Sequence, residues 1–380
     1  MRLSFCSHHI VTFLARHAKE PGKPLDLALS EYLRQHKSIG SHDRKSISET
    51  IYGLIRWKGL LDYLYPDPPS FADRLKRFAE INWPKVLSDP SIPEHIRLGT
   101  TEFLFEALKK AYGLEKARAL CKIFLSPPPT AVRANLLKTT REELLAKWTE
   151  KFDVSLSTRA PNGIVFAKRE ALFALSEFKD GLFEMQDEGS QLVASLVEAR
   201  SGEHVLDYCS GSGGKSLAFA PSMQGKGQIY LHDVRASALF QAKQRLKRAG
   251  VQNAQLLSPD HPKLPQLKRK MDWVLADVPC SGTGTLRRHP EMKWKIDGAF
   301  ISRLVQEQRE IFEKALLYVR PGGKIVYATC SILPEENQHQ LDYFLSKFDL
   351  TLDRDPLYIL PEEGKMDGFF GAVFRTSIVL

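Results

Sequence analysis

Apolar residues recur every three or four positions along the first 125 residues, and this spacing is typical of helices. The repeat is clearest around residues 25–33, 47–55 and 103–108. Almost no stretch of this region alternates apolar and polar residues with the two-residue period of a half-buried strand. We therefore predict an all-helical domain over residues 1–125.

A proline-rich stretch at residues 126–129 ends this pattern, because proline cannot continue a helix and stiffens a linker. Beyond it, Thr140 and Glu143 have the spacing of a capping box, which predicts the start of a helix. Short apolar runs at 164–166 and 182–185 predict strands. The interpretation is a linker and a small α+β subdomain over residues 126–180.

Strand-like and helix-like segments alternate in the remainder of the chain, which we assign to one domain over residues 181–380. This alternation is typical of a doubly wound, mostly parallel sheet, so the predicted fold class is α/β and Rossmann-like. Two last apolar runs predict an antiparallel hairpin at the sheet's C-terminal edge. The expected strands are 204–208, 228–232, 254–258, 273–277 and 324–329, the expected helices include 236–249 and 299–318, and the hairpin runs are 368–374 and 377–380.

Composition limits the class of protein. Hydrophobic residues make up 43% and charged residues 26%, as in an ordinary globular protein. No apolar stretch approaches the roughly 20 residues of a membrane helix, and the N-terminus lacks the features of a signal peptide. We therefore expect a cytoplasmic protein without a membrane partner.

The net charge of +9 favours an anionic partner, and nucleic acid is the first candidate. Basic residues interleaved with Trp57, Tyr63 and Tyr65 form either a solvated helix face or an RNA-binding face.

The five cysteines include no CxxC pair and no histidine pair nearby at zinc spacing, so neither a metal site nor a disulfide framework is expected. Cys280 and Cys330 each follow a strongly apolar run. If those runs are neighbouring parallel strands, both thiols emerge at the carboxyl ends, where such folds place their chemistry. Pro334 is followed by two acidic residues, and this pattern predicts the start of a helix. The amide groups at that helix start would help to hold a Cys330 thiolate.

A glycine-rich turn follows the first strand of the predicted sheet, where the backbone can approach a ligand closely. Its spacing is neither that of a phosphate-binding Walker loop nor GxGxxG. Asp233 lies roughly 20 residues further on, where an acid typically binds ribose hydroxyls. Asp260 follows the third strand and is either an acceptor for an adenine amino group or a turn residue. The turn comprises Cys209, Ser210, Gly211, Ser212, Gly213, Gly214 and Lys215.

Together these motifs resemble the Sun-type RNA cytosine-5 methyltransferases, which use S-adenosylmethionine. The resemblance covers residues 127–380 and departs from the family at Ser212, where proline is usual. The N-terminal helices are similar, more weakly, to the NusB-like RNA-binding domain of the family's bacterial ribosomal member. The motifs are Asp43-Arg44, 51–56, Arg133, Asn135, Gln186-Asp187, Cys209–Lys215, Asp277–Gly282, Arg287, Pro290, Lys293-Trp294, Thr329–Ser331 and Asp367–Phe370.

The resemblance implies a role for each residue. Cys330 would be the nucleophile that adds to C6 of cytosine, and Cys280 would assist release. Asp277 and Lys215 would contact the target base. S-adenosylmethionine would lie against Cys209–Lys215, Asp233, Asp260 and Asp277. The implied partner is RNA, with 16S rRNA as substrate, and we expect a monomer without a metal.

Three alternatives stay open. The substrate could be tRNA, or the enzyme could act on DNA with Cys280 as the nucleophile. The chain could also be a non-catalytic RNA-binding or ribosome-assembly protein.

Overall fold

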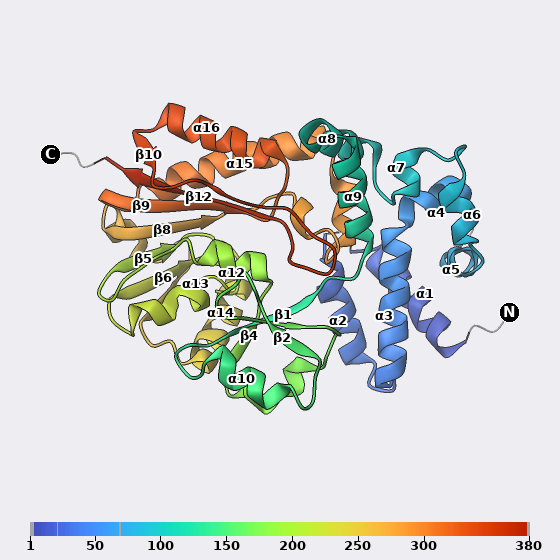
Figure 1. Cartoon of the computed structure of the whole chain (residues 1–380), viewed down its shortest axis with the longest axis horizontal. Coiled ribbons are helices and arrows are strands. Elements are labelled where there is room, and N and C mark those ends of the chain that lie inside the picture. The colour runs from blue at the N-terminus through green and yellow to red at the C-terminus, as the bar shows by residue number, and fades with distance from the viewer. Residues whose placement is uncertain (1–3, 21, 68–69, 378–380) are drawn as a thin grey trace. The chain divides into compact units, whose positions relative to one another are not determined.

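The structure of the protein is a computed structural model that describes residues 4–20, 22–67 and 70–377 (Figure 1). The chain divides into two compact units. The first consists of residues 1–127 together with 285–300, and the second of residues 128–284 and 301–380.

The first unit is helical, as the apolar spacing predicts. Its core is formed where α1, α2 and α3 contribute apolar side chains such as Phe13, Leu29 and Ile47, all of them buried. Ser4, Ser70 and other polar residues cap the helices. The elements are α1 (Phe5–His17), α2 (Leu25–Gln35), α3 (Ser41–Arg56), α4 (Lys58–Leu64), α5 (Phe71–Ala79), α6 (Trp83–Ser88), α7 (Glu94–Arg97), α8 (Glu102–Tyr112), α9 (Leu114–Leu125) and the 3₁₀ turn η5 (Pro290–Lys295).

Residues 285–300 join this unit through a buried lysine, which the local sequence pattern does not reveal. Lys293 is fully buried, and its Nζ donates hydrogen bonds to the carbonyl oxygens of Gly99 at 2.6 Å and Arg56 at 3.2 Å. Trp294 Nε1 donates to the carbonyl of Ile55 at 2.8 Å. Burial lowers the pKa of Lys293 to about 7. These contacts tie a segment far along the chain to α3 and to the turn before α8.

A small antiparallel sheet with the strand order β2-β3-β1-β4 opens the second unit. The predicted capping box is present: Thr140 Oγ1 accepts from the N–H of Glu143 at 3.2 Å, and Glu143 accepts from the N–H of Thr140 at 3.0 Å. Trp148 and Phe183 pack in the small core beside the sheet. The elements are β1 (Thr130–Ala134), α10 (Arg141–Trp148), β2 (Val154–Leu156), β3 (Gly163–Phe166), α11 (Ser176–Lys179) and β4 (Phe183–Met185).

The large sheet of this unit has the order β10-β12-β9-β8-β5-β6-β7, and β11 also pairs with β12. Neighbours from β7 to β9 are parallel, and β12 runs antiparallel to β9. The predicted strands and helices are therefore present, with shifts of a few residues at their ends. The elements are α12 (Glu188–Ala194), β5 (His204–Asp207), α13 (Ser216–Phe219), β6 (Gln228–His232), α14 (Ala236–Ala249), β7 (Ala254–Leu257), β8 (Met271–Asp277), α15 (Gly298–Leu316), β9 (Val319–Thr329), η6 (Pro334–Glu336), α16 (Gln338–Lys347), β10 (Leu350–Leu352), β11 (Leu357–Ile359) and β12 (Phe369–Thr376).

The predicted C-terminal hairpin is wrong in its pairing. Its first run is β12, which pairs with β9 on one side and with β10 and β11 on the other. Most of its second run, residues 378–380, lies outside the described residues. The antiparallel edge is thus built from segments that precede β12 in the chain.

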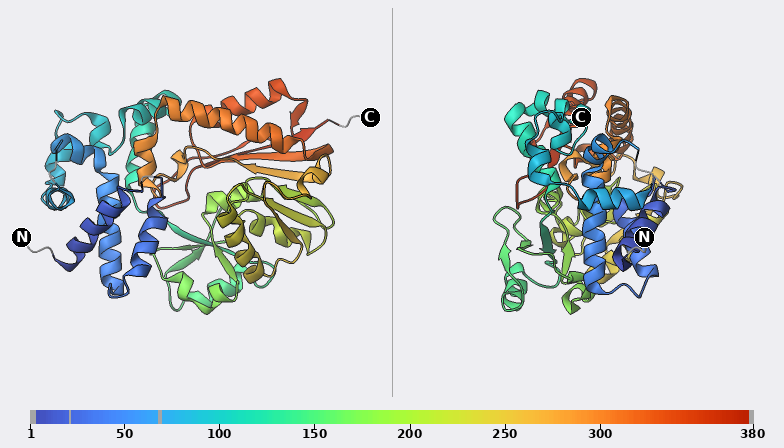
Figure 2. Two further views of the ribbon diagram at one scale, coloured as in Figure 1. Left: turned by 180° about the vertical axis from the view of Figure 1, so that it is seen from behind. Right: turned by 90° about the vertical axis from the view of Figure 1, so that its right-hand side faces the viewer.

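Helices cover both faces of the large sheet, which explains why its strands are apolar on both sides. α12, α13 and α14 pack on the face that carries Val205 and Leu275. α15 and α16 pack on the face that carries Val274 and Tyr327. The views in Figure 2 show this separation, with the orange helices on one side of the strands and the yellow-green ones on the other. The central strands β5, β8 and β9 are therefore largely buried on both faces, and the loops that follow them are where side chains reach the surface.

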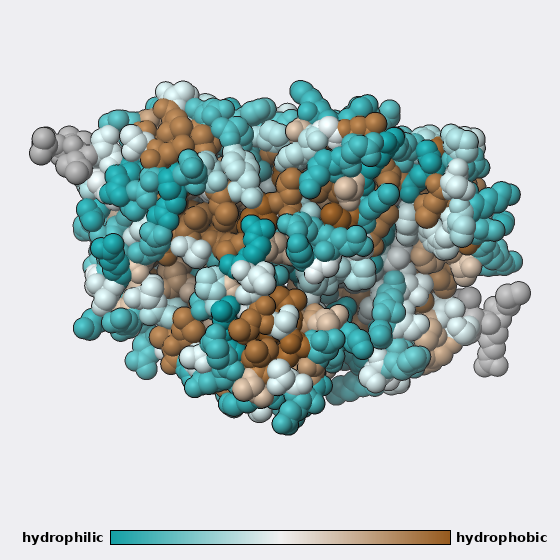
Figure 3. Space-filling model, viewed as in Figure 1, coloured by the Kyte–Doolittle hydropathy of each residue, from teal (hydrophilic) through white to brown (hydrophobic). Residues whose placement is uncertain are grey.

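The surface is mixed in character. In the view of Figure 3, polar side chains are interspersed with apolar ones. Within residues 4–20, 22–67 and 70–377, no helix is both long and apolar enough to cross a membrane. The same residues contain no group of three or more His, Cys, Asp or Glu side chains placed to hold a metal ion.

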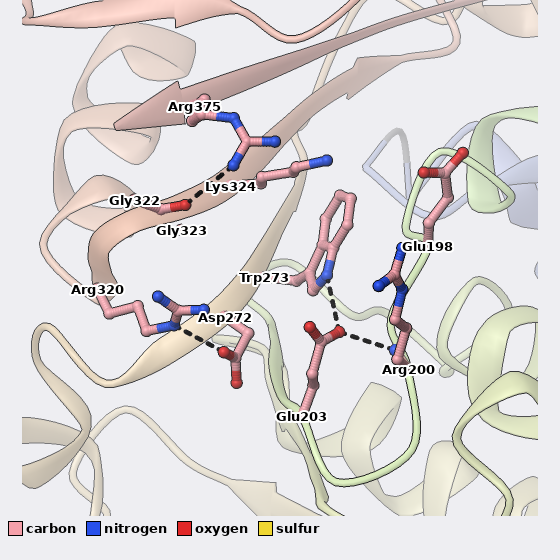
Figure 4. A pocket seen from close by; sticks show the side chains of 10 residues that line it. All are labelled: Glu198, Arg200, Glu203, Asp272, Trp273, Arg320, Gly322, Gly323, Lys324 and Arg375. Atoms are coloured by element: carbon pink, nitrogen blue, oxygen red, sulfur yellow. Dashed lines mark hydrogen bonds and ion pairs between the residues drawn. The ribbon is translucent and has the colours of Figure 1, made fainter. Parts of the chain in front are cut away.

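A hollow at the amino ends of the strands is rich in paired charges (Figure 4). Arg320 Nε donates to Asp272 at 2.7 Å, and Trp273 Nε1 donates to Glu203 at 3.1 Å. The thiols follow the opposite ends of these strands. The hollow therefore lies at the other end of these strands from the two thiols.

An ion-pair cluster beside this hollow predicts acid sensitivity. Asp353 accepts hydrogen bonds from Lys324 at 2.9 Å, Arg375 at 2.7 Å and Arg354 at 3.2 Å. Burial alone would raise the pKa of Asp353, but these donors hold it at about 2. Because the folded-state pKa lies below the unfolded value of about 3.9, the stabilisation is complete above pH 4 and is lost as the pH falls through about 2.

We expect Asp353→Asn to lower the free energy of unfolding by about 1–2 kcal/mol at pH 7, a figure discounted because the arginine partners are partly exposed. The loss should shrink steadily between about pH 4 and pH 2. Urea unfolding at several pH values measures both effects. A loss of equal size at every pH would show that the charge of Asp353 is not the cause.

Candidate functional site

Two thiols meet at the carboxyl edge of the large sheet. β8 and β9 are parallel neighbours in which Asp277 lies opposite Ala328, so the loops that follow them start side by side. Cys280 Sγ and Cys330 Sγ are 3.2 Å apart, and the N–H of Cys330 donates to Cys280 Sγ at 3.3 Å. Both side chains are partly exposed. The structure thus brings together two cysteines that are 50 positions apart in the sequence, at an edge that a substrate can reach.

The two thiols differ in acidity. The hydrogen bond from Cys280 lowers the pKa of Cys330, and the charge of Lys215 acts in the same direction. The same hydrogen bond, together with burial, raises the pKa of Cys280 well above its usual value. Within the pair, the lowered pKa belongs to Cys330 and the raised pKa to Cys280. Since the thiolate is the nucleophilic form of cysteine, this order favours Cys330 as the nucleophile.

An ion pair lies beside the thiols. Lys215 Nζ donates to Asp277 Oδ2 in a short contact. Burial alone would lower the pKa of Lys215, but the charge and the hydrogen bond of Asp277 raise it, so the ammonium stays charged. Asp277 ends β8 and Lys215 ends the glycine-rich turn, so this contact joins the two loops of the site. A cation and a carboxylate are thereby presented together next to the reactive sulfur.

The glycine-rich turn runs from β5 into α13. Gly211 and Gly213 have positive φ angles of 53° and 77°, which side-chain-bearing residues rarely adopt. The N–H of Gly211 donates to Asp233 Oδ2 at 2.8 Å. Ser210 Oγ and Asp207 Oδ1 are buried without a hydrogen-bond partner among the described residues. Unpaired buried polar atoms at a sharp turn are what a polar ligand would satisfy.

Asp233 directly follows β6, and its carboxylate is charged. Burial alone would raise its pKa, but hydrogen bonds from Arg235 and from the N–H of Gly211 lower it. The Arg235 side chain is 66% exposed, so it can turn away and leave the carboxylate to a ligand. Asp260, by contrast, is exposed beyond β7, and no hydrogen bond to a described residue orients its side chain. The structure brings Asp233 into the site but does not place Asp260 in its hydrogen-bond network.

The thiol of Cys209 is not a reactive one. Cys209 lies in the turn at the end of β5, and burial raises the pKa of its thiol. Its thiol therefore stays protonated at neutral pH. Of the three cysteines in this unit, only Cys280 and Cys330 are paired with each other.

Arg245 clamps the glycine-rich turn through a contact that the sequence does not predict. Arg245, on α14, donates from Nη1 to the carbonyl oxygen and to Oγ of Ser212, at 3.1 and 2.7 Å. Its Nε and Nη2 donate to Glu184 on β4, at 3.1 and 3.0 Å. The small sheet thereby holds the turn in place. No local pattern could reveal this contact, because the three residues are far apart in the chain.

The segment after Cys330 does not begin an α-helix at Pro334, contrary to the prediction from the sequence. Residues 334–336 form a short 3₁₀ turn, and α16 begins only at Gln338. Glu336 was expected to stabilise a helix N-terminus, but its side chain is fully buried and accepts hydrogen bonds from Ser281 and Ser331. The groups that lower the pKa of Cys330 are Cys280 and Lys215 rather than helix amides.

A solved structure shares this fold. The methyltransferase homolog protein from Pyrococcus horikoshii is 27% identical, with a TM-score of 0.65, and the match covers 76% of this chain and 99% of that one. The second unit is therefore a Rossmann-like methyltransferase fold, as the sequence predicts.

Comparison of sequences identifies the family. The profile of the 16S rRNA methyltransferase RsmB/F family matches residues 194–375, and the profile of the ferredoxin-like domain of RsmF/B-like methyltransferases matches residues 101–172. Ribosomal RNA small subunit methyltransferase B of Enterobacter is 34% identical over 71% of this chain, and the probable methyltransferase B of Synechocystis is 30% identical over 80%. The chain belongs to the RsmB/F family. It spans 65% of the Enterobacter protein and 73% of the Synechocystis protein.

The family also confirms S-adenosylmethionine as the cofactor, and the residues of the site fit it. The unpaired Ser210 Oγ and Asp207 Oδ1 offer hydrogen-bonding groups, and Asp233 is a charged acceptor suited to ribose hydroxyls. Gly211 leaves room on its open side, where an added Cβ would meet only Arg235 Nη2, at 3.7 Å. The cofactor would therefore be held by the turn and by the ends of β5 and β6.

We expect Arg245→Gln to weaken S-adenosylmethionine binding by about tenfold, because the turn loses a charge-assisted hydrogen bond of about 1.5 kcal/mol. The kcat at saturating cofactor should change little. Isothermal titration calorimetry measures the affinity. Arg248→Gln is the matched control, since Arg248 also pairs with Glu184 but has no hydrogen bond to the turn. Normal affinity in Arg245→Gln, or an equal loss in both variants, would contradict the clamp.

Proposed function

We propose that this chain is an RNA cytosine-5 methyltransferase that acts on 16S rRNA. The single observation that carries the proposal is the pair of thiols 3.2 Å apart, with Cys330 the more acidic of the two. One thiol of such a pair can attack a base while the other governs its departure. Family membership supports 16S rRNA as the substrate.

The reaction needs a nucleophile because C5 of cytosine is itself a poor one. Addition of the Cys330 thiolate to C6 forms a carbon–sulfur bond and gives C5 the character of an enamine carbon, which divides one difficult step into two easier ones. S-adenosylmethionine bound nearby supplies the electrophilic methyl group. The Lys215–Asp277 pair can hydrogen-bond the ring and stabilise the charge that addition places on it.

Release requires the reverse chemistry at C6. Once C5 carries the methyl group, its proton leaves to a base, the C5–C6 double bond re-forms and the carbon–sulfur bond breaks. The departing Cys330 thiolate then regains the hydrogen bond from Cys280, which lowers the energy of the leaving group. Cys280 thus assists release without itself attacking the base.

We infer the following division of labour along the chain. Residues 1–125 would be a NusB-like domain that binds RNA, residues 126–180 a linker and supporting subdomain, and residues 181–380 the catalytic domain. The base has to leave its stack to reach the thiols, so an unpaired or flipped cytosine is the expected target. The monomeric state and the cytoplasmic location stay predictions.

Bisulfite sequencing of total RNA from cells with and without the protein tests the proposal. We expect one cytosine of 16S rRNA to lose its protection when the protein is absent. Loss of a protected cytosine in tRNA would assign the alternative substrate. No change in any RNA, together with no S-adenosylmethionine binding in calorimetry, would support a non-catalytic RNA-binding protein instead.

A further inference from the structure

A buried glutamate lies between the two cysteine loops. Glu336 is fully buried, although no part of the proposed chemistry uses it. Ser281 directly follows Cys280, and Ser331 directly follows Cys330. Both serines donate hydrogen bonds to this one carboxylate. A single side chain therefore connects the residues next to each thiol.

The contacts use both carboxylate oxygens. Ser281 donates from its N–H to Oε1 at 2.8 Å and from Oγ to Oε2 at 2.5 Å. Ser331 Oγ donates to Oε2 at 2.5 Å. The loop after β8 is thus held by two bonds and the loop after β9 by one. The distance between the loops depends on where this carboxylate sits.

The carboxylate is itself held by neighbours on other elements. Gln308 on α15 donates from Nε2 to Glu336 Oε1 at 2.9 Å and to the carbonyl of Pro279 at 3.0 Å. Tyr327 on β9 donates from its hydroxyl to the carbonyl oxygen of Glu336 at 2.8 Å. The position of Glu336 is therefore determined by a network that reaches from the helix to the strand.

The chemistry of the site favours a carboxylate over an amide. A carboxylate only accepts hydrogen bonds, and here each of its oxygens receives two donors. An amide at the same place would turn its NH₂ group toward two of these partners. If they are the serine hydroxyls, both would have to change from donating to accepting, and their charge-assisted hydrogen bonds would become weaker neutral ones. A glutamine at this position would therefore keep the shape of the side chain and loosen its hold on both loops.

We propose that Glu336 is a positioning residue that sets the spacing of Cys280 and Cys330 by holding Ser281 and Ser331 together. The inference deepens the proposed function and rests on it, because the spacing decides whether Cys280 can donate its proton to the Cys330 sulfur. Glu336 touches neither thiol in the hydrogen-bond network, and it acts through the two serines.

Disulfide formation measures the spacing without any need for RNA. Diamide takes the two thiol hydrogens and becomes a hydrazine, and a sulfur–sulfur bond forms between Cys280 and Cys330. Peptide mapping by mass spectrometry follows the rate in the full-length chain. We expect Glu336→Gln to slow it by about tenfold or more, and to lower kcat for methylation by about 100-fold, with little change in KM for RNA. Glu310→Gln, an exposed change on α15, is the matched control.

Thermal denaturation and S-adenosylmethionine titration show whether Glu336→Gln is folded. If it is folded and keeps both the disulfide rate and kcat, the proposal is overturned. If it does not fold, the Ser281→Ala/Ser331→Ala variant retains the carboxylate and removes its hydroxyl donors. A slower disulfide rate there supports the proposal, and an unchanged rate overturns it. If the unaltered chain does not methylate RNA but the disulfide rate still depends on Glu336, the proposed function fails while the spacing role stands.

Discussion

Cys330→Ala is expected to abolish methylation, with a loss of more than about 1,000-fold in kcat. The variant removes the cysteine of the pair whose pKa is lowered. Without addition at C6, C5 does not become nucleophilic, and a bound methyl donor has nothing to react with. The remaining thiol does not replace it, because burial still raises the pKa of Cys280 when the hydrogen bond with Cys330 is gone.

Transfer of a radiolabelled methyl group from S-adenosylmethionine to RNA measures this loss. Cofactor affinity should be unchanged in Cys330→Ala, which separates a defect in chemistry from a defect in binding. Cys6→Ala, in the helical unit, is the control for removal of a cysteine outside the site. Methylation at more than a few per cent of the normal rate would show that Cys330 is not the nucleophile.

Cys280→Ala is expected to accumulate a covalent protein–RNA adduct. Addition needs only the Cys330 sulfur. Its pKa rises when the Cys280 hydrogen bond is lost, which slows addition, but the charge of Lys215 still acts to lower that pKa. Departure, however, loses the hydrogen-bond donor that lies 3.2 Å from the leaving sulfur. We expect turnover to fall by about 100-fold or more, a size typical of a missing proton donor. Most of the enzyme should then be trapped on its product.

Denaturing gels with labelled RNA detect the adduct, and mass spectrometry of the linked peptide locates it at Cys330. The adduct should form only in the presence of S-adenosylmethionine if release is what fails after methyl transfer. Normal turnover in Cys280→Ala would remove the assigned role. Adduct formation by Cys330→Ala would instead make Cys280 the nucleophile, as in the DNA-type alternative.

Much of the fold could be predicted from local pattern. The three- and four-residue spacing in the N-terminal region and the apolar runs before Cys280 and Cys330 correspond to real helices and strands. Such patterns are readable because a helix or strand buries one side of a short, contiguous segment. The capping box at Thr140 was predictable for the same reason, since both partners lie within one turn.

Two residues show what short sequence patterns do not predict about the site. Asp260 follows a strand, as Asp233 does, yet it lies exposed outside the hydrogen-bond network of the site. Glu336 looks like an ordinary acid at a helix start, yet it is buried between two loops. In both cases the residue type and its neighbours in the chain are uninformative. The contacts that bury Glu336 come in part from residues 28 and 55 positions away, Gln308 and Ser281.

The sequence by itself determined the alternating strands and helices, the glycine-rich turn and the two cysteines placed after neighbouring strands. Only the tertiary structure decided how these parts act together. It set the 3.2 Å distance between the two sulfurs and decided which thiol has the lower pKa. It also placed Arg245 against the glycine-rich turn and Glu336 between the two loops. The physical reason is that hydrogen bonding and pKa depend on distances of a few ångströms, which the packing of remote segments establishes.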